Sequence, residues 1–416
     1  MTTTEFHNAL LQGRGKCVQA VRRDPEKYRE EVLWACRELI SFDTQCEGSK
    51  AWFIREMVRC YEDPAPFVTA ACEALRECPS NGGWNLFCLA ELLEWFFRDG
   101  HVEAWKALLQ KYRQLYRELL HVGPPEDCLI WAAKGDYNGL CVILSWCRDH
   151  YLEIARDIGR LFVETEWSDG WDFDWLYHTK GQRYHRALER AAEKDEYIAA
   201  YIRVHEEAIR EDEARTVERK RTRLPRRNAD PEEVSRAMER YLAAETTEER
   251  AAALDAFWVC PYPGEPGPVI ADACSENERL RNVAWRVLER IRHPDVREFA
   301  LAKLESVDEA FGVLAANYEE ADEERLLARL RGEELDYECN TWWHGFQLDV
   351  LGMKKPPKAA LQYIYDTTYC SCCRENALSM MGKRRMLTQE LLEECVFDSS
   401  DDIRSYARRA LRRRKR

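Results

Sequence analysis

Apolar and polar positions alternate with the period of an α-helix over residues 277–307, where two helical stripes follow one another. In the first stripe, apolar side chains recur three and four positions apart, which is the spacing of one helix face. Its members are Leu280, Val283, Ala284, Val287, Leu288 and Ile291. Pro294 begins the second stripe, because a proline at the first helical position gives up an N–H that has no partner there. The second set is Val296, Phe299, Ala300 and Leu304. The short link between them predicts an antiparallel helix pair that must stack on neighbours to bury both stripes.

The same start signal recurs along the chain. An aspartate precedes a proline at Asp24-Pro25, Asp63-Pro64 and Asp230-Pro231, and this combination is typical of helix N-termini. Glycine and proline otherwise gather between the periodic segments, at 79–83, 123–125 and 261–268. No segment has the period of a strand. The pattern therefore predicts an all-α protein.

A short motif, apolar-Arg-x-x-Ala, repeats in the second half of the chain. Its arginines are Arg281, Arg297, Arg374 and Arg404, and a weaker copy contains Arg250. Several copies lie on a ladder of about 31 residues, within the range of repeat architectures. We expect the apolar residue and the alanine to face a partner helix, while the arginine caps or pairs at a turn.

At these residues the chain resembles a known family. HPDVREFALAKL (293–304) and SSDDIRSYARRAL (399–411) are similar to the first helix of HEAT repeats. The resemblance covers about 246–306 and 370–412, and residues 24–53 also look similar to bacterial HEAT-repeat proteins of unassigned function. It implies an α-solenoid, a superhelix of antiparallel helix pairs, and most often protein–protein binding. It brings no catalytic residues with it.

A run of charge marks a boundary near the middle of the chain. From about Glu206 to Arg227 the sequence is acidic and then basic, which favours a solvated helix leading into a linker over a phosphate-binding patch. We therefore expect three parts: a divergent helical-repeat region at 1–205, a charged helix or linker at 206–229, and a HEAT-like repeat region at 230–416.

Composition narrows the class of function. The net charge of -13 argues against a protein that mainly coats nucleic acid or an anionic membrane. No apolar run is long enough to span a bilayer, and residues 1–16 lack the apolar core of a signal peptide. These features predict a cytoplasmic protein. In that compartment the 17 cysteines are expected to be mostly free thiols, many of them at helix-stripe positions.

The densest candidate site is the segment 164–178, in which tryptophans spaced four apart alternate with carboxylates. One interpretation is a Trp stripe that docks on the core while the acids stay in water. The other is a binding site for a basic partner, held by cation–π contacts and charge-assisted hydrogen bonds. The candidate binding residues are Trp167, Asp169, Trp171, Asp172, Asp174 and Trp175.

Other constellations favour no metal, cofactor or enzyme. Cys370, Cys372 and Cys373, with Cys339 and His344 upstream, lack the paired spacing of structural zinc sites. Phosphate loops, dinucleotide fingerprints and hydrolase elbows are absent from the sequence. The basic stretch 404–416 is interpreted first as a helix end whose cations offset the helix dipole, and second as a nucleic-acid contact.

Two hypotheses follow. The first is a non-catalytic interaction scaffold or adaptor that binds a protein or peptide on a solenoid surface. The alternative is a nucleic-acid-binding enzyme on HEAT-like repeats, similar to bacterial alkylpurine DNA glycosylases. That alternative needs a basic concave face, which an acidic chain supplies less readily.

Overall fold

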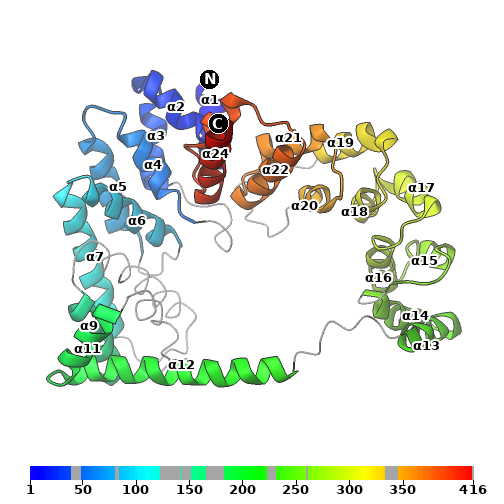
Figure 1. Cartoon of the computed structure of the whole chain (residues 1–416), viewed down its shortest axis with the longest axis horizontal. Helices are drawn as coiled ribbons and strands as arrows, with labels where there is room; N and C mark the ends of the chain where they lie inside the picture. The colour runs from blue at the N-terminus through cyan, green and yellow to red at the C-terminus, as the bar shows by residue number, and fades with distance from the viewer. Residues whose placement is uncertain are drawn as a thin grey trace. The chain divides into compact units, whose positions relative to one another are not determined.

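The described part of the chain is helical. The computed structural model describes residues 1–38, 48–79, 84–121, 141, 151–164, 182–222, 231–258, 261–332 and 345–414. Every regular element in these ranges is a helix, and none is a strand (Figure 1). The all-α class expected from the sequence is thus confirmed. None of the helices in these ranges is both long and apolar enough to cross a membrane.

The chain folds into two compact units, and each is described by itself. Unit 1 comprises Met1–Thr222 with Thr388–Arg416, and unit 2 comprises Arg223–Leu387. Unit 1 contains α1 (Thr3–Gln12), α2 (Lys16–Arg23), η1 (Glu26–Tyr28), α3 (Arg29–Glu38), α4 (Ala51–Val58), α5 (Ala65–Glu77), α6 (Trp84–Arg98), α7 (Val102–His121), α9 (Tyr151–Glu164), α11 (Gln182–Ala192), α12 (Glu196–Thr222), α23 (Gln389–Cys395) and α24 (Asp401–Arg414). Unit 2 contains α13 (Pro231–Ala243), α14 (Thr247–Leu254), η3 (Asp255–Trp258), α15 (Gly267–Asp272), α16 (Glu278–Leu288), α17 (Pro294–Lys303), α18 (Glu309–Ala316), η4 (Glu320–Asp322), α19 (Glu323–Arg331), α20 (Gly345–Gly352), α21 (Lys358–Thr367) and α22 (Ser371–Lys383).

The units divide the chain differently from the three regions expected at 1–205, 206–229 and 230–416. The charged run up to residue 222 continues the long helix α12 and belongs to unit 1. Residues 388–416, which we expected to close the C-terminal repeat region, also belong to unit 1. The reason is tertiary, because α23 packs on α2 and α24 packs on α23.

The contact between the two ends of the chain is specific. Arg14 Nε lies 2.7 Å from Glu394 Oε1, and the Ser399 N–H donates to the Gly13 carbonyl oxygen at 2.8 Å. The guanidinium of Arg22 lies 4.1 Å from the ring centre of Phe397. The two ends of the chain are therefore packed together within unit 1.

The proline start signals place helix N-termini as expected. Pro231 and Pro294 are the first residues of α13 and α17. Asp63 Oδ1 accepts a hydrogen bond from the Ala65 N–H at 3.0 Å, at the start of α5. The signal at Asp24 differs slightly, because a short 3-10 turn precedes α3. Local proline chemistry thus fixes where these helices begin.

The two apolar stripes predicted over residues 280–304 belong to α16 and α17, but the two helices do not pack mainly on each other. α16 packs on α14 and α15, whereas α17 packs on α18. Residues 310–315 of α18 are all buried, so α18 offers α17 a larger apolar surface than the single stripe of α16. The direct contact between α16 and α17 includes the stacked rings of Trp285 and Phe299, whose centroids are 5.1 Å apart. The two helices predicted over 280–304 therefore form, but each packs mainly on a different neighbour.

The motif arginines hold turns and neighbouring helices, as the repeat pattern predicted. Arg250 Nε lies 2.8 Å from Asp272, and Arg297 makes a two-pronged contact with Asp322. Arg281 donates to the Ser275 carbonyl oxygen at 3.0 Å. An arginine side chain is a charged, fork-shaped donor, so these three satisfy acceptors at helix ends and turns. The remaining members are Arg404, discussed below, and the fully buried Arg374.

Candidate functional site

Helix α7 has one face that unit 1 buries and one that it leaves open. The buried face packs on α5, α6 and α9. It consists of Ala104, Trp105, Ala107, Leu108, Lys111, Tyr112, Leu115 and Leu119. A helix with one such stripe exposes polar residues on the other side. In α7 the side chains of that other face line a pocket.

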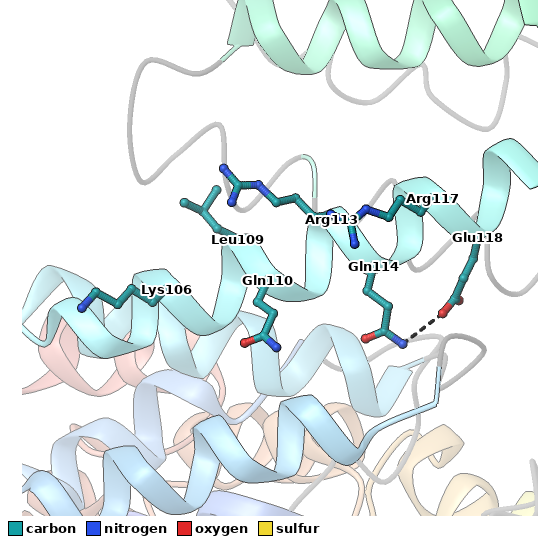
Figure 2. A pocket seen from close by; sticks show the side chains of 7 residues that line it. All are labelled: Lys106, Leu109, Gln110, Arg113, Gln114, Arg117 and Glu118. Atoms are coloured by element: carbon teal, nitrogen blue, oxygen red, sulfur yellow. Dashed lines mark hydrogen bonds between the residues drawn. The ribbon is translucent and has the colours of Figure 1, made fainter.

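The open face forms a groove of about 680 Å³, which among the described residues is lined by α7 alone. This volume lies within the usual range of ligand-binding clefts. Figure 2 shows two rows of side chains four residues apart. One row is Leu109, Arg113 and Arg117, and the other is Gln110, Gln114 and Glu118, with Lys106 at the N-terminal end. We call these seven residues the α7 groove.

The helix under the groove is held rigidly from behind. Tyr112 Oη donates to Asp157 Oδ2 of α9 at 2.6 Å, and the buried Lys111 ammonium donates to the Cys78 carbonyl oxygen. Burial raises the pKa of Asp157, and the hydrogen bond from Tyr112 acts in the opposite direction. These buried contacts fix the rotation of α7 about its axis. The groove residues therefore project from a preorganised backbone.

The groove offers positive charge and amide groups together. Lys106, Arg113 and Arg117 are exposed cations, and Glu118 is the single carboxylate among the lining residues that the structure describes. Gln114 Nε2 donates to Glu118 Oε1 at 3.0 Å, so this pair is already oriented (Figure 2). Glutamine both donates and accepts hydrogen bonds. The arrangement can bind a segment that carries carboxylates and also presents backbone N–H and C=O groups. Among the described lining residues no nucleophile is paired with a base.

The site predicted from the sequence is not among the residues that the structure describes. Trp167, Asp169, Trp171, Asp172, Asp174 and Trp175 all fall outside the described residues. The structure therefore brings none of them together and separates none of them. Their interpretation as a binding site for a basic partner stays a prediction.

The cysteine cluster that we considered for zinc serves as a helix cap. Cys370 Sγ accepts a hydrogen bond from the Cys373 N–H at 3.5 Å at the start of α22. Both cysteines are buried, while Cys339 and His344 lie outside the described residues. Within those residues no group of three or more potential metal ligands gathers. The reduced, metal-free state expected for the cysteines stays a prediction.

A buried carboxylate on α6 was not apparent from the sequence. Glu94 is 2 % exposed and pairs with Arg98. Burial raises the pKa of Glu94 to about 7, Arg98 opposes the rise, and the neighbouring Glu91 adds to it. A carboxyl tuned in this way is a common feature of active sites. Here it faces helix packing and a single cation, so we interpret it as a determinant of pH-dependent stability.

Sequence reasoning also missed the α7 groove, although a signal was present. We identified 102–120 only as a helix. Its polar face carries cations and glutamines at 106, 110, 113, 114 and 117. An ordinary solvated face pairs such cations with acids three or four residues away. The described lining of the α7 groove has three cations and one acid, Glu118. This excess of cations is the signal of a binding surface that the sequence contained.

No protein-family model, curated protein or solved structure matches this chain. The groove is therefore interpreted from its own geometry and charge.

Proposed function

We propose that this protein is a non-catalytic interaction scaffold, and that the α7 groove binds a segment of a protein partner. The observation that carries the proposal is the open face of α7, where three exposed cations and two glutamines line a hollow on a rigidly held helix. A buried aromatic and aliphatic face supports the helix from behind. Preorganised polar groups of this kind give an interface its specificity.

The proposed architecture is a HEAT-like α-solenoid of antiparallel helix pairs. The recurrent motif arginines support it, because Arg250 and Arg297 each hold an aspartate that follows 22 or 25 residues later. The two contacts are alike, and recurring contacts of one kind between stacked helices support an array. The contact of α23 and α24 with the first helices would then close an array whose ends otherwise need polar caps.

The charge of the groove selects the chemistry of the partner. Three cations against one carboxylate favour an acidic segment, and the glutamines can pair with its backbone. A phosphate backbone would fit less well, because the Glu118 carboxylate repels it and because phosphate oxygens only accept hydrogen bonds, so they offer no donor to the glutamine carbonyls.

A photo-crosslinking amino acid at Gln114 in the source cells tests the proposal. We expect one protein to be captured through an acidic segment, and capture to be lost when Arg113→Glu and Arg117→Glu are added. The control places the same group at Glu73, an exposed position of α5 in unit 1. Equal capture at both positions, or capture that survives the charge reversal, would contradict the proposal.

The nucleic-acid enzyme stays a separate hypothesis. It requires a basic surface beside a catalytic acid and an aromatic wedge, and the α7 groove supplies only the first of these. Base excision by the purified protein would overturn the non-catalytic proposal.

A further inference from the structure

The last helix of unit 1 presents a second, denser cationic surface. Arg408, Arg409, Arg412 and Arg413 are all exposed on α24. At about 100° per residue they fall within about 140° of one another around the helix. Among the described residues none of the four guanidinium groups has an ion-pair partner. We call these four residues the α24 arginine face.

The opposite side of α24 is anchored firmly. Ile403 and Ala407 are fully buried. Arg404 lies 3.9 Å from the ring centre of Trp52 and donates to the carbonyl oxygens of Asp398 and Ser399, both at 2.6 Å. The pKa of Arg404 is lowered to about 10, first by burial and also by the nearby charge of Arg408. The four arginines are therefore held together in spite of their mutual repulsion.

We propose that the α24 arginine face binds the phosphate backbone of a nucleic acid. The helix dipole alone does not explain the face, because the dipole amounts to about half a charge and acts within the last turn. Arg408 and Arg409 lie before that turn. Arginine also has the planar fork that suits phosphate oxygens, which a lysine ammonium lacks.

The charge density of the α24 arginine face matches that of double-stranded DNA. From residue 408 to residue 413 the helix rises about 7.5 Å, and double-stranded DNA carries about four charges over that axial length. Over this length the four arginines thus match the phosphate charge of a duplex, counted over both strands. An extended peptide, with about 3.4 Å per residue, would supply at most about two carboxylates, even if every residue were acidic. The α24 arginine face thus favours nucleic acid, whereas the α7 groove, with its amides and carboxylate, favours peptide.

A membrane fits this helix less well. A helix that lies on a bilayer needs a free apolar face to bury among the lipids. In α24 that face is used inside unit 1, since Ile403 and Ala407 are already covered. The proposal is independent of the α7 groove. Together the two surfaces would make the scaffold an adaptor between an acidic protein and a nucleic acid.

Fluorescence anisotropy of the full chain with two labelled probes tests the proposal. The probes are a 20-base-pair DNA duplex and a 20-nucleotide single-stranded RNA, titrated from 50 to 200 mM salt. We expect binding whose logarithmic salt dependence has a slope near 3.6 for the duplex, about 0.9 for each neutralised phosphate. The single-stranded slope should be near 2.8, from about 0.7 per phosphate. The probe bound more tightly identifies the type of nucleic acid.

Variants separate this surface from the rest of the chain. Changing all four arginines to glutamine should weaken binding at least 30-fold at 50 mM salt, and each single change should lower the duplex slope by about 1. These side chains are exposed, so circular dichroism should stay unchanged and the melting temperature should not fall. The matched control is Arg236→Gln with Arg240→Gln, an exposed pair at the same spacing on α13, which should bind like the wild type.

Three results would overturn the proposal. They are no binding of either probe at 50 mM salt, equal binding by the four-arginine variant, and tighter binding to vesicles containing 30 % phosphatidylserine than to both probes. The variant Arg113→Glu with Arg117→Glu should keep nucleic-acid binding. The failure of one surface can therefore be told apart from the failure of the other.

Discussion

The guanidinium of Arg297 holds both carboxylate oxygens of Asp322, with N–O distances of 2.8 and 2.6 Å. Asp322 is 3 % exposed, and its Oδ2 also accepts from the Glu319 N–H at 3.0 Å. The contact therefore fastens α17 to the turn before α19. Arg250 and Asp272 make a related contact between α14 and α15, with Tyr241 Oη donating to the same carboxylate at 2.5 Å.

Arg297→Met should lower the free energy of unfolding by about 2 kcal/mol, because it leaves a buried carboxylate without its cation. Adding Asp322→Asn should recover part of the loss, since the two side chains are directly coupled. Urea unfolding measures both. The control is Arg286→Met, whose exposed pairing with Asp255 at 3.3 Å should be worth less than about 1 kcal/mol. Equal losses at the two arginines would show that the Asp322 contact is not structural.

Gly15→Ala should destabilise unit 1 by about 1 to 3 kcal/mol through overpacking. A methyl group at Gly15 would collide with the backbone of Glu394 and Phe397, so α23 would have to move away from α2. The control, Gly48→Ala, has no atom within 4 Å of the added carbon and should leave stability nearly unchanged. Thermal unfolding of the two variants decides whether the ends of the chain are packed as described.

Glu94 should make stability fall as pH rises. An unfolded glutamate titrates near about 4.3, whereas the folded pKa is about 7. As pH rises, the Glu94 carboxyl therefore loses its proton at a higher pH in the folded state than in the unfolded state. The free energy of unfolding that this difference contributes is complete below about pH 4 and is lost by about pH 7. Glu94→Gln should remove this loss. The unfolding free energy at pH 8 should then rise by on the order of 2 kcal/mol, which is less than the full pKa difference implies because water screens part of the charge.

The same variant should show no gain at pH 4, where the wild-type carboxyl is already neutral. Glu73→Gln, an exposed change on α5, serves as the control and should not alter the pH profile. Urea unfolding between pH 4 and pH 8 makes the comparison. A Glu94→Gln profile parallel to that of the wild type would contradict the assignment.

Local signals in the sequence predicted local structure. Proline and aspartate marked the starts of α5, α13 and α17, and the stripe from Leu280 to Leu288 is buried as expected. The motif arginines were recognised because their spacing is regular. Their acidic partners were not, since Asp272 and Asp322 lie at different distances from them and belong to no motif.

Relationships between distant segments could not be predicted in this way. Arg14 and Glu394 are 380 residues apart, and neither has a pattern that points to the other. The choice of α18 as the main partner of α17 depends on the total apolar surface, which a single stripe does not measure. The α7 groove depends on which face of an amphipathic helix stays open, and that is decided by α5, α6 and α9 together.

The most direct test of the central claim measures how the purified chain binds the partner segment captured at Gln114, synthesised as a fluorescein-labelled peptide. The claim is that the cations of the α7 groove hold an acidic segment. Arg113→Glu with Arg117→Glu should weaken binding at least tenfold, or about 1.4 kcal/mol, whereas Arg236→Glu with Arg240→Glu on α13 should not. Replacing the acids of the peptide by glutamine should weaken binding to the wild type by a similar factor. Equal affinity of the wild type and the α7 variant for the unaltered peptide would contradict the claim.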